Sequence, residues 1–144
     1  MEYLIIVPIS FSGALLSPLL FRILPKRAGL LITAIPLFLF TWAFLKMLSI
    51  VDGVIFQDTL TWVESFGVDL VFRLDGLSVF FLLLITGFGV FIYLYANSYL
   101  ALDKNRPRFF VFLSLFMGAM VGLVMSGSLL LMFVFWELTS LSSY

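Results

Sequence analysis

One acidic residue interrupts the longest apolar part of the chain. Phe109 to Tyr144 is a run of 36 residues, and Glu137 is its only charged member. A carboxylate near the middle of a bilayer costs about 2.5–3.5 kcal/mol on insertion scales, so sequences rarely keep one there without a use. The functional interpretation of Glu137 is a proton or cation site. The structural alternative is an ion pair, or a protonated carboxyl group hydrogen-bonded between helices.

Hydroxyl side chains follow Glu137, whereas the residues before it are apolar. The hydroxyl-bearing residues are Thr139, Ser140, Ser142, Ser143 and Tyr144. Ser140 and Tyr144 stand three and seven positions after Glu137, which puts them on the same helical face. The segment from Leu129 to Trp136 has no polar side chain apart from the indole of Trp136. The pattern predicts a polar path that leaves Glu137 in one direction only.

Two further sites have a mainly structural interpretation. Asp75 precedes an apolar segment, where a carboxylate typically caps a helix N-terminus, although it could also admit an ion. Arg73 is expected to anchor that segment at the membrane interface. Gly118 and Gly122 form a G-x-x-x-G pair, which lets helix backbones approach closely and predicts helix packing.

The composition excludes most other kinds of protein. Hydrophobic residues make up 63% of the 144 residues, charged residues make up 11%, and the net charge is zero. These values exclude a soluble globular domain, a disordered chain and a nucleic-acid-binding protein. The chain has no His and no Cys, which removes the commonest general base and metal ligand as well as thiolate chemistry. No cofactor and no metal site are expected.

Hydropathy predicts an all-α polytopic membrane protein with about five transmembrane helices. A span needs about 20 apolar residues, because the hydrocarbon core is about 30 Å thick. The first segment has no basic region before it, so we interpret it as a retained span and not as a signal peptide. The last 36 residues are too long for one crossing, and Gly127 permits a tight turn within them. The predicted helices are about 3–21, 28–48, 76–98, 109–125 and 128–144.

Residues 49–73 differ from the rest of the chain. They carry five charged side chains and no uncharged stretch long enough to span a membrane. Thr59–Val63 and Val68–Phe72 have the β-branched and aromatic content of short strands, joined by Glu64–Gly67. They predict a short extracellular β-hairpin between the second and third helices, with a disordered loop as the alternative.

The distribution of basic residues predicts the orientation. Six of the eight Lys and Arg residues lie in the first and third connections, namely Arg22, Lys26, Arg27, Lys104, Arg106 and Arg108. The positive-inside rule places those connections in the cytoplasm and the N-terminus outside. The fifth predicted helix reaches Tyr144 with nothing polar after it, so we expect a fragment or a split subunit whose helix continues elsewhere.

Four short motifs carry a family resemblance. They are Phe72–Ser78, Leu84–Gly89, Leu115–Met120 and Phe135–Ser143. Together they resemble the N-terminal part of the A subunit of Mrp-type multisubunit sodium/proton antiporters. That family is similar in turn to the antiporter-like large subunit of respiratory complex I and of membrane-bound hydrogenases. The resemblance covers residues 59–144 well, and the first two helices by hydropathy only.

The resemblance implies a role for Glu137. In that family the glutamate of the F-W-E-L-T-S motif is a proton-pathway residue that pairs with a lysine on a later helix, and that lysine is absent here. The family commonly has Asp-Asn where this chain has Gly127-Ser128. Residues 1–144 are accordingly expected to form a single transmembrane domain, the N-terminal portion of a larger subunit in the cell membrane. The implied partners are other antiporter subunits, the lipid bilayer, and Na+ and H+ as transported ions.

Two other functions remain open at this point. One is a proton-pumping subunit of a complex I-like oxidoreductase or of a membrane-bound hydrogenase, in which electron transfer elsewhere drives transport. The other is a non-transporting truncated scaffold. Antiporter subunits are transporters and not enzymes, so only the first of these alternatives attaches the chain to an enzyme.

Overall fold

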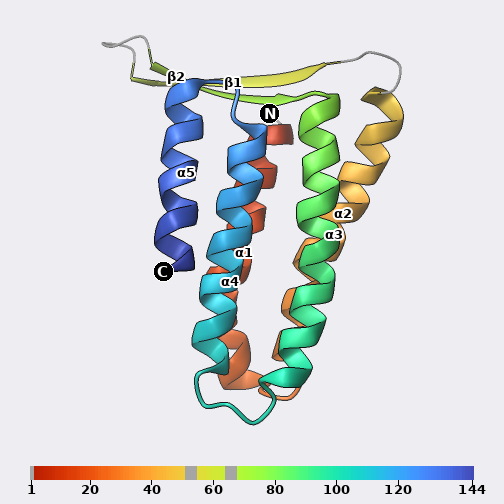
Figure 1. Cartoon of the computed structure of the whole chain (residues 1–144), viewed down its shortest axis with the longest axis vertical. Helices are drawn as coiled ribbons and strands as arrows, with labels where there is room; N and C mark the ends of the chain where they lie inside the picture. The colour runs from red at the N-terminus through yellow and green to blue at the C-terminus, as the bar shows by residue number, and fades with distance from the viewer. Residues whose placement is uncertain (1, 51–54, 64–67) are drawn as a thin grey trace.

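Five helices and a two-stranded hairpin make up the described part of the chain. The computed structural model describes residues 2–50, 55–63 and 68–144. The elements in chain order are α1 (Glu2–Ile23), α2 (Ala28–Ile50), β1 (Phe56–Val63), β2 (Val68–Leu74), α3 (Gly76–Tyr99), α4 (Arg106–Met125) and α5 (Leu129–Ser143). The helices stand side by side with alternating direction, and the hairpin lies across one end of them (Figure 1).

Four of the helices are long and apolar enough to cross a membrane. These are α1 to α4, whereas α5 has only 15 residues and so a length of about 22 Å. In Figure 1, α5 accordingly ends partway along α4. The predicted class, a largely helical membrane protein with a short hairpin, is confirmed. The number of crossings stays a prediction.

Several helix boundaries differ from the predicted ones by one to three residues, most of all the start of α4. α4 begins at Arg106, three residues before the predicted start at Phe109. Pro107 lies in its first turn, where the missing N–H has no intrahelical acceptor to lose. α1 continues past Arg22 to Ile23, because a charge ends an apolar stretch without ending the helical backbone.

The hairpin between α2 and α3 is antiparallel and longer than predicted. Phe56 pairs with Leu74 and Thr59 with Val71, and the register shifts between Thr61 and Val63. The predicted turn at Glu64–Gly67 lies outside the described residues.

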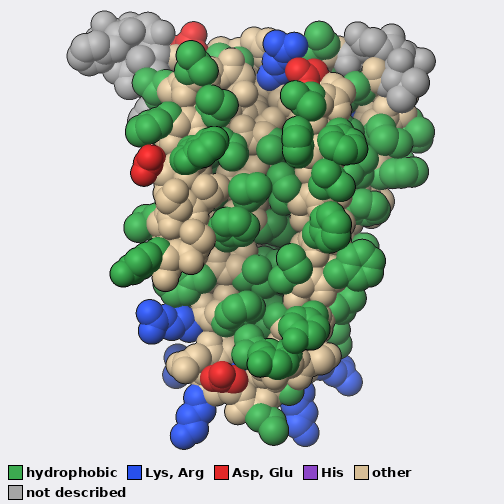
Figure 2. All heavy atoms as spheres, in the orientation of Figure 1, with side chains coloured by type: hydrophobic (Ala, Val, Ile, Leu, Met, Phe, Trp, Pro, Cys, Tyr) green, Lys and Arg blue, Asp and Glu red, His purple; other side chains and the backbone are tan. Residues whose placement is uncertain are grey.

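The two ends of the helix bundle carry different side chains. One end, the hairpin end, holds β1, β2 and the α4–α5 turn; the other, the basic end, holds the α1–α2 and α3–α4 connections. Figure 2 shows hydrophobic side chains over the lateral face and Lys and Arg gathered at the basic end. Most basic side chains therefore gather at the basic end, whereas the hairpin end carries both signs, including Arg73 and Asp75, and the lateral face between the two ends is mainly apolar.

The interior of the bundle is formed mainly by α1 to α4, and β2 and α5 add Phe72, Leu74, Leu131 and Phe135 to it. Its largest fully buried side chains include Ile32, Leu39, Leu82, Tyr93 and Phe110. The Tyr93 hydroxyl donates to Ser114 Oγ at 2.9 Å, which joins α3 to α4 inside the core. A buried hydroxyl needs such a partner, because an unpaired polar group in an apolar interior is costly.

The hairpin is tied to the α4–α5 turn. The backbone N–H of Gly127 donates to the Val71 carbonyl at 2.7 Å, and Phe72 forms a β-bridge with Ser126. A Cβ on Gly127 would lie 2.7 Å from Val71 Cγ1 and 3.0 Å from its carbonyl oxygen. The glycine is therefore required by the close approach of β2, and not by the tight turn that we expected.

Candidate functional site

The helix that carries Glu137 has one face against the bundle and one face away from it. Ser128 caps α5 by accepting a hydrogen bond from the Leu131 N–H at 3.3 Å. Leu131 and Phe135 are the buried residues of this helix. Glu137 follows Phe135 by two positions, which is about 200° around a helix, so the two side chains leave α5 on opposite sides. The carboxylate accordingly lies on the outer face of α5 and is exposed.

Glu137 has no cationic neighbour in the residues that the structure describes. The ion pair of Arg73 with Asp75 lies elsewhere, at the hairpin end. The family resemblance implied a lysine partner that residues 1–144 lack, and the described residues accordingly place no Lys or Arg within ion-pair distance of Glu137. What surrounds the carboxylate must come from lipid, water or another polypeptide segment.

The residues of the predicted polar path lie in and just after the last turns of α5. Thr139 Oγ1 donates to the Trp136 carbonyl at 2.6 Å, and Ser143 Oγ donates to the Ser140 carbonyl at 3.1 Å. Such local bonds are the usual way in which a helix satisfies its hydroxyl groups. They use the hydroxyl protons but leave oxygen lone pairs free to accept from water. Ser140 and Tyr144 are exposed, as Glu137 is.

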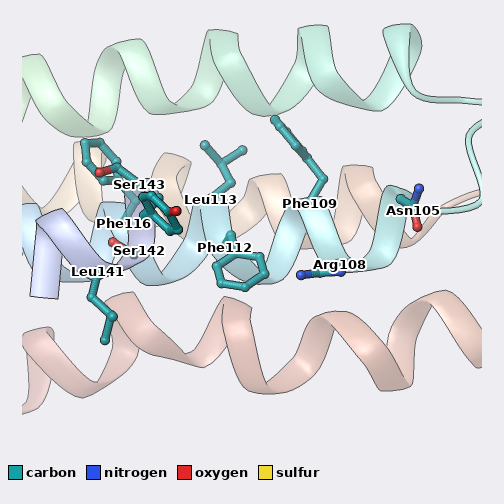
Figure 3. A pocket seen from close by; sticks show the side chains of 10 residues that line it. Asn105, Arg108, Phe109, Phe112, Leu113, Phe116, Leu141, Ser142 and Ser143 are labelled. Carbon is teal, nitrogen blue, oxygen red and sulfur yellow. The ribbon is translucent and has the colours of Figure 1, made fainter.

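A cavity of about 790 Å³ opens beside the last turn of α5. Its α4 lining is Asn105, Arg108, Phe109, Phe112, Leu113 and Phe116, and its α5 lining is Leu141, Ser142, Ser143 and Tyr144. Figure 3 shows Asn105 and Arg108 at one end of it, with Ser142 and Ser143 at the other. Ser143 and Tyr144 of the predicted path thus line the same cavity as Arg108, and Ser143 lies at the opposite end of it from Arg108. Glu137, Thr139 and Ser140 are not part of its lining.

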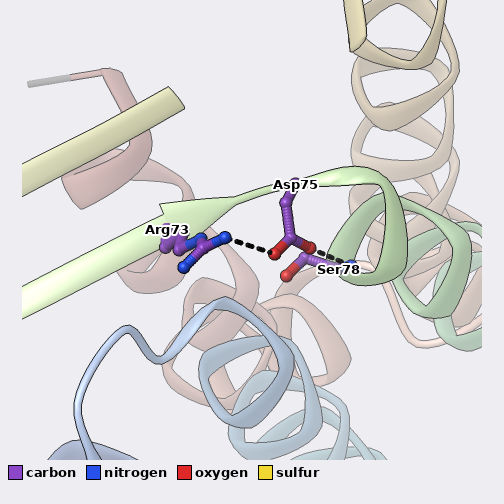
Figure 4. Close-up of polar contacts among 3 residues, drawn as sticks. All are labelled: Arg73, Asp75 and Ser78. Atoms are coloured by element: carbon purple, nitrogen blue, oxygen red, sulfur yellow. Dashed lines mark hydrogen bonds and ion pairs between the residues drawn. The ribbon is translucent and has the colours of Figure 1, made fainter. Parts of the chain in front are cut away.

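Asp75 is held as a helix cap and as one half of an ion pair. Its carboxylate accepts from the Ser78 N–H at 3.0 Å and lies 3.3 Å from the Arg73 guanidinium (Figure 4). The backbone hydrogen bond from Ser78 is the main cause that lowers the pKa of Asp75, and the Arg73 charge adds to it. Both partners favour the ionised carboxylate, which suits a cap at the positive end of α3. This geometry fits the structural interpretation of Asp75, in which its carboxylate caps the N-terminus of α3.

Gly118 and Gly122 lie at two different helix contacts. A Cβ on Gly118 would be 2.8–2.9 Å from the ring of Phe11 in α1. A Cβ on Gly122 would be 2.3–2.5 Å from the ring of Phe135 in α5. The two glycines are one helical turn apart, and each one admits an aromatic ring from a different neighbour. α4 therefore packs between α1 and α5.

Arg106 is the residue whose position the sequence analysis missed. It was assigned to a polar connection, but its side chain is only 8% exposed. The guanidinium donates to Asn97 Oδ1 and to the Pro25 carbonyl, and it lies 5.0 Å from the ring centre of Phe21. The one available signal was Pro107, which favours a helix start at that point. Hydropathy alone counts any arginine as exposed.

Comparison with protein families identifies a family that matches the middle of the chain. Residues 60–110 match the family described as NADH-ubiquinone oxidoreductase (complex I), chain 5 N-terminus. The matched segment runs from β1 into the first turns of α4, so it includes Asp75 but not Glu137.

Curated relatives match over nearly the whole chain. The A1 subunit of the Na(+)/H(+) antiporter of Staphylococcus haemolyticus is 41% identical over 142 residues, which cover 97% of this chain and 17% of the relative. The A subunit of the Na(+)/H(+) antiporter of Alkalihalophilus pseudofirmus is 41% identical over 136 residues, with coverages of 92% and 17%. The chain thus spans about a sixth of the length of these relatives.

A solved structure has the same fold. A chain of the Mrp complex from a Dietzia species superposes with a TM-score of 0.85 and 28% sequence identity, covering 99% of this chain and 15% of that one. The resemblance predicted from the four motifs is confirmed, and it extends to α1 and α2, where only hydropathy supported it. The chain resembles the N-terminal part of the A subunit of Mrp-type sodium/proton antiporters.

Proposed function

Given that resemblance, we propose that the chain acts in a multisubunit complex that exchanges Na+ and H+ across the cell membrane. Residues 1–144 form one transmembrane domain that contacts the bilayer and other antiporter subunits. The chain contributes one protonatable group, Glu137, and a cationic partner for it comes from outside these residues. This is the role of a transporter subunit, with no chemical reaction of its own.

The observation that carries the proposal is the exposed Glu137 on an apolar helix. A carboxylate on the lateral face of a membrane helix is costly against lipid, so it is expected to face protein or a water-filled cavity. There it takes up and releases a proton. Thr139, Ser140, Ser143 and Tyr144 then lead from it toward the cavity beside Arg108, where water can enter from the basic end.

The test is Glu137→Gln in the intact complex. Gln keeps the shape and the hydrogen-bonding capacity of Glu but cannot release a proton. We expect sodium-dependent proton movement in membrane vesicles to stop, while the yield of assembled complex stays the same. If Glu137 were only a structural ion pair, the mutation would leave a buried charge unpaired, and assembly would fail along with transport.

Two controls accompany this experiment. Glu137→Asp retracts the carboxylate by about one bond length, so it should slow proton movement without stopping it, because proton transfer needs strict geometry. Asp103→Asn removes an exposed carboxylate from the α3–α4 connection and should leave the flux unchanged. Normal flux together with normal assembly in Glu137→Gln would refute the proposal.

The proposed orientation has the basic end in the cytoplasm and the N-terminus outside. Residues 1–144 contain no native cysteine, so within this segment each introduced thiol reports on one position. A thiol introduced by Lys104→Cys should react with an impermeant maleimide only when the cytoplasmic face is open. A thiol introduced by Thr61→Cys, in β1, should react in sealed cells. The opposite pattern would invert the topology.

A second function is favoured by the family that matches residues 60–110. Its description belongs to complex I, so the chain could act as a proton-pumping subunit of a complex I-like oxidoreductase or of a membrane-bound hydrogenase. Copurification separates the two functions. Quinone- and iron–sulfur-binding subunits would indicate the oxidoreductase, and small membrane subunits alone would indicate the antiporter. A non-transporting scaffold predicts that Glu137→Gln changes nothing.

A further inference from the structure

Phe135 is enclosed by three segments that are far apart in the sequence. Its ring centre lies 6.5 Å from that of Phe11 in α1 and 6.3 Å from that of Phe72 in β2. On the third side, Gly122 of α4 has no side chain and so leaves room for the Phe135 ring. We call this site the Phe135 socket, formed by Phe11, Phe72 and Gly122. Phe135 is 8% exposed and Phe72 is 5% exposed, so the socket is closed to solvent.

The socket lies close to a second attachment of α5. The Gly127 N–H donates to the Val71 carbonyl, one residue before Phe72, and the Phe72–Ser126 bridge lies beside that bond. The start of α5 is thus held by the backbone of β2, and its second turn is held by a β2 side chain. Two attachments at different heights limit both the tilt and the rotation of a helix.

The rotation of α5 decides where Glu137 points. Phe135 and Glu137 are two positions apart, so a helix that turns Phe135 into the bundle turns Glu137 out of it. A helix without the socket could rotate by one residue position and bring Glu137 against α4 or into lipid. The hairpin therefore acts on the carboxylate without touching it.

We infer that Phe72 is a positioning residue: through the Phe135 socket it sets the rotation of α5 and hence the direction of the Glu137 carboxylate. The inference rests on the proposed function of Glu137 and adds the hairpin to it. Hydropathy assigns β1 and β2 only to the membrane surface. The contacts make β2 a part of the machinery that aligns the proton site.

The rotation itself is measurable by spin-label distances. Nitroxides at Phe133→Cys in α5 and Phe91→Cys in α3 occupy exposed positions, and residues 1–144 contain no native cysteine; cysteines elsewhere in the complex are replaced beforehand. Phe133 shares the outer face with Glu137. Side chains extend about 5–6 Å from a helix axis, so a rotation by one residue position shifts the label by several ångströms. We expect Phe72→Ala in the intact complex to shift or broaden the distance distribution by that amount.

Transport measurements complete the test. Phe72→Ala should lower proton flux by about tenfold or more, since a displacement of about 1 Å in a reacting group can cost about 100-fold. It should also move the pH at which flux is half-maximal, which a simple loss of folded complex would not do. The matched control is Phe88→Ala, which removes a 63% exposed ring from α3 and should change neither distance nor flux. Phe72→Leu keeps an apolar side chain, should give a smaller shift in the same direction, and decides the question if the Ala variant does not assemble.

The outcomes separate the two proposals. Unchanged distances in both Phe72 variants would overturn the positioning role. A shifted distance with unchanged flux would also overturn it, provided that Glu137→Gln abolishes flux. If Glu137→Gln leaves flux intact, the proposed function fails, and the inference built on it fails with it even where the distance shifts. A shifted distance with lowered flux and a displaced pH profile supports the inference.

Discussion

Arg106 and Glu137 are both charged side chains on apolar helices, but Arg106 is buried and Glu137 is exposed. Arg106, at the start of α4, is enclosed by Asn97, the Pro25 carbonyl and the ring of Phe21. Glu137, on α5, is enclosed by nothing in the described residues. A cation surrounded by neutral acceptors and a ring serves to hold helices together. An anion left open on an apolar face needs a partner from elsewhere, which is why we assign a structural role to Arg106 and propose a functional one for Glu137.

The largest effect should come from Arg106→Ala. Truncation leaves the Asn97 amide oxygen and the Pro25 carbonyl without their donor, and it removes the contact with Phe21. An unsatisfied buried polar group costs about 1–3 kcal/mol, and a desolvated cation–π contact is worth about 2 kcal/mol. We expect the free energy of unfolding in detergent to fall by about 2–4 kcal/mol.

Arg108→Ala is the matched control for that measurement. Arg108 is exposed two residues further along α4 and lies 5.6 Å from the ring centre of Phe112, so its removal should cost less than about 1 kcal/mol. If Arg106→Ala and Arg108→Ala lose the same free energy of unfolding, the enclosed Arg106 is no more stabilising than the exposed Arg108, and the structural role assigned to Arg106 is wrong. Glu137→Gln should leave the free energy of unfolding nearly unchanged.

The next effect concerns the inner face of α5. Gly122→Leu places a side chain where the Phe135 ring now lies, within 2.3–2.5 Å of the new Cβ. Overpacking of this kind costs about 1–3 kcal/mol and should weaken the association of α5 with α4. The measurement is the yield and thermal stability of the assembled complex.

Leu123→Ala is the reference for the Gly122 prediction: it removes a partly buried side chain from the neighbouring position, so it shows the cost of a lost packing contact without any added volume. Assembly and stability that match those of the unaltered complex in Gly122→Leu would mean that α5 can move off α4 without loss. The contrast between an inner, packed face and an outer, exposed face of α5 would then not hold.

The smallest loss of stability is expected at Asp75, which is bound by the Ser78 N–H and the Arg73 guanidinium. Asp75→Ala removes the cap of α3 and the ion pair with Arg73, which should cost about 1 kcal/mol. Because the pKa of Asp75 is lowered in the folded chain, its contribution is present above the unfolded pKa of about 3.9 and is lost as the pH falls through the folded value.

Asp75→Asn sharpens this prediction. The amide oxygen can still cap α3, but it does not titrate. The stability of the unaltered chain should therefore fall more than that of Asp75→Asn when the pH is lowered below about 4. Parallel acid unfolding curves for the two chains would show that the charge of the Asp75 carboxylate does not contribute to stability.

Local patterns in the sequence predicted the elements, and long-range contacts decided the details. Apolar runs located the helices, and the β-branched content of residues 59–72 located the hairpin, because both signals depend on neighbouring residues. The burial of Arg106 depends on Pro25, 81 residues away, and no local pattern records that contact. Gly118 and Gly122 read as one packing motif, yet they meet different helices.

The candidate site was predictable in kind but not in orientation. The lone charge identified Glu137, and the hydroxyl spacing identified the residues after it. The direction of the carboxylate depends on how Phe135 fits among α1, α4 and β2, which are all distant in sequence. The cavity beside Arg108 likewise arises only when α4 and α5 are paired.

The bond between β2 and the α4–α5 turn has a consequence for the order in which the chain is made. Phe72 leaves the ribosome 63 residues before Phe135. At about 5–20 residues per second, this interval lasts roughly 3–13 s. For most of it, until Gly127 has been made 55 residues after Phe72, β2 has neither Gly127 nor Phe135 to bind, and its outer edge stays open to other strands. The hairpin end can close only after α5 has been synthesised, so closure at that end is a late step in biogenesis.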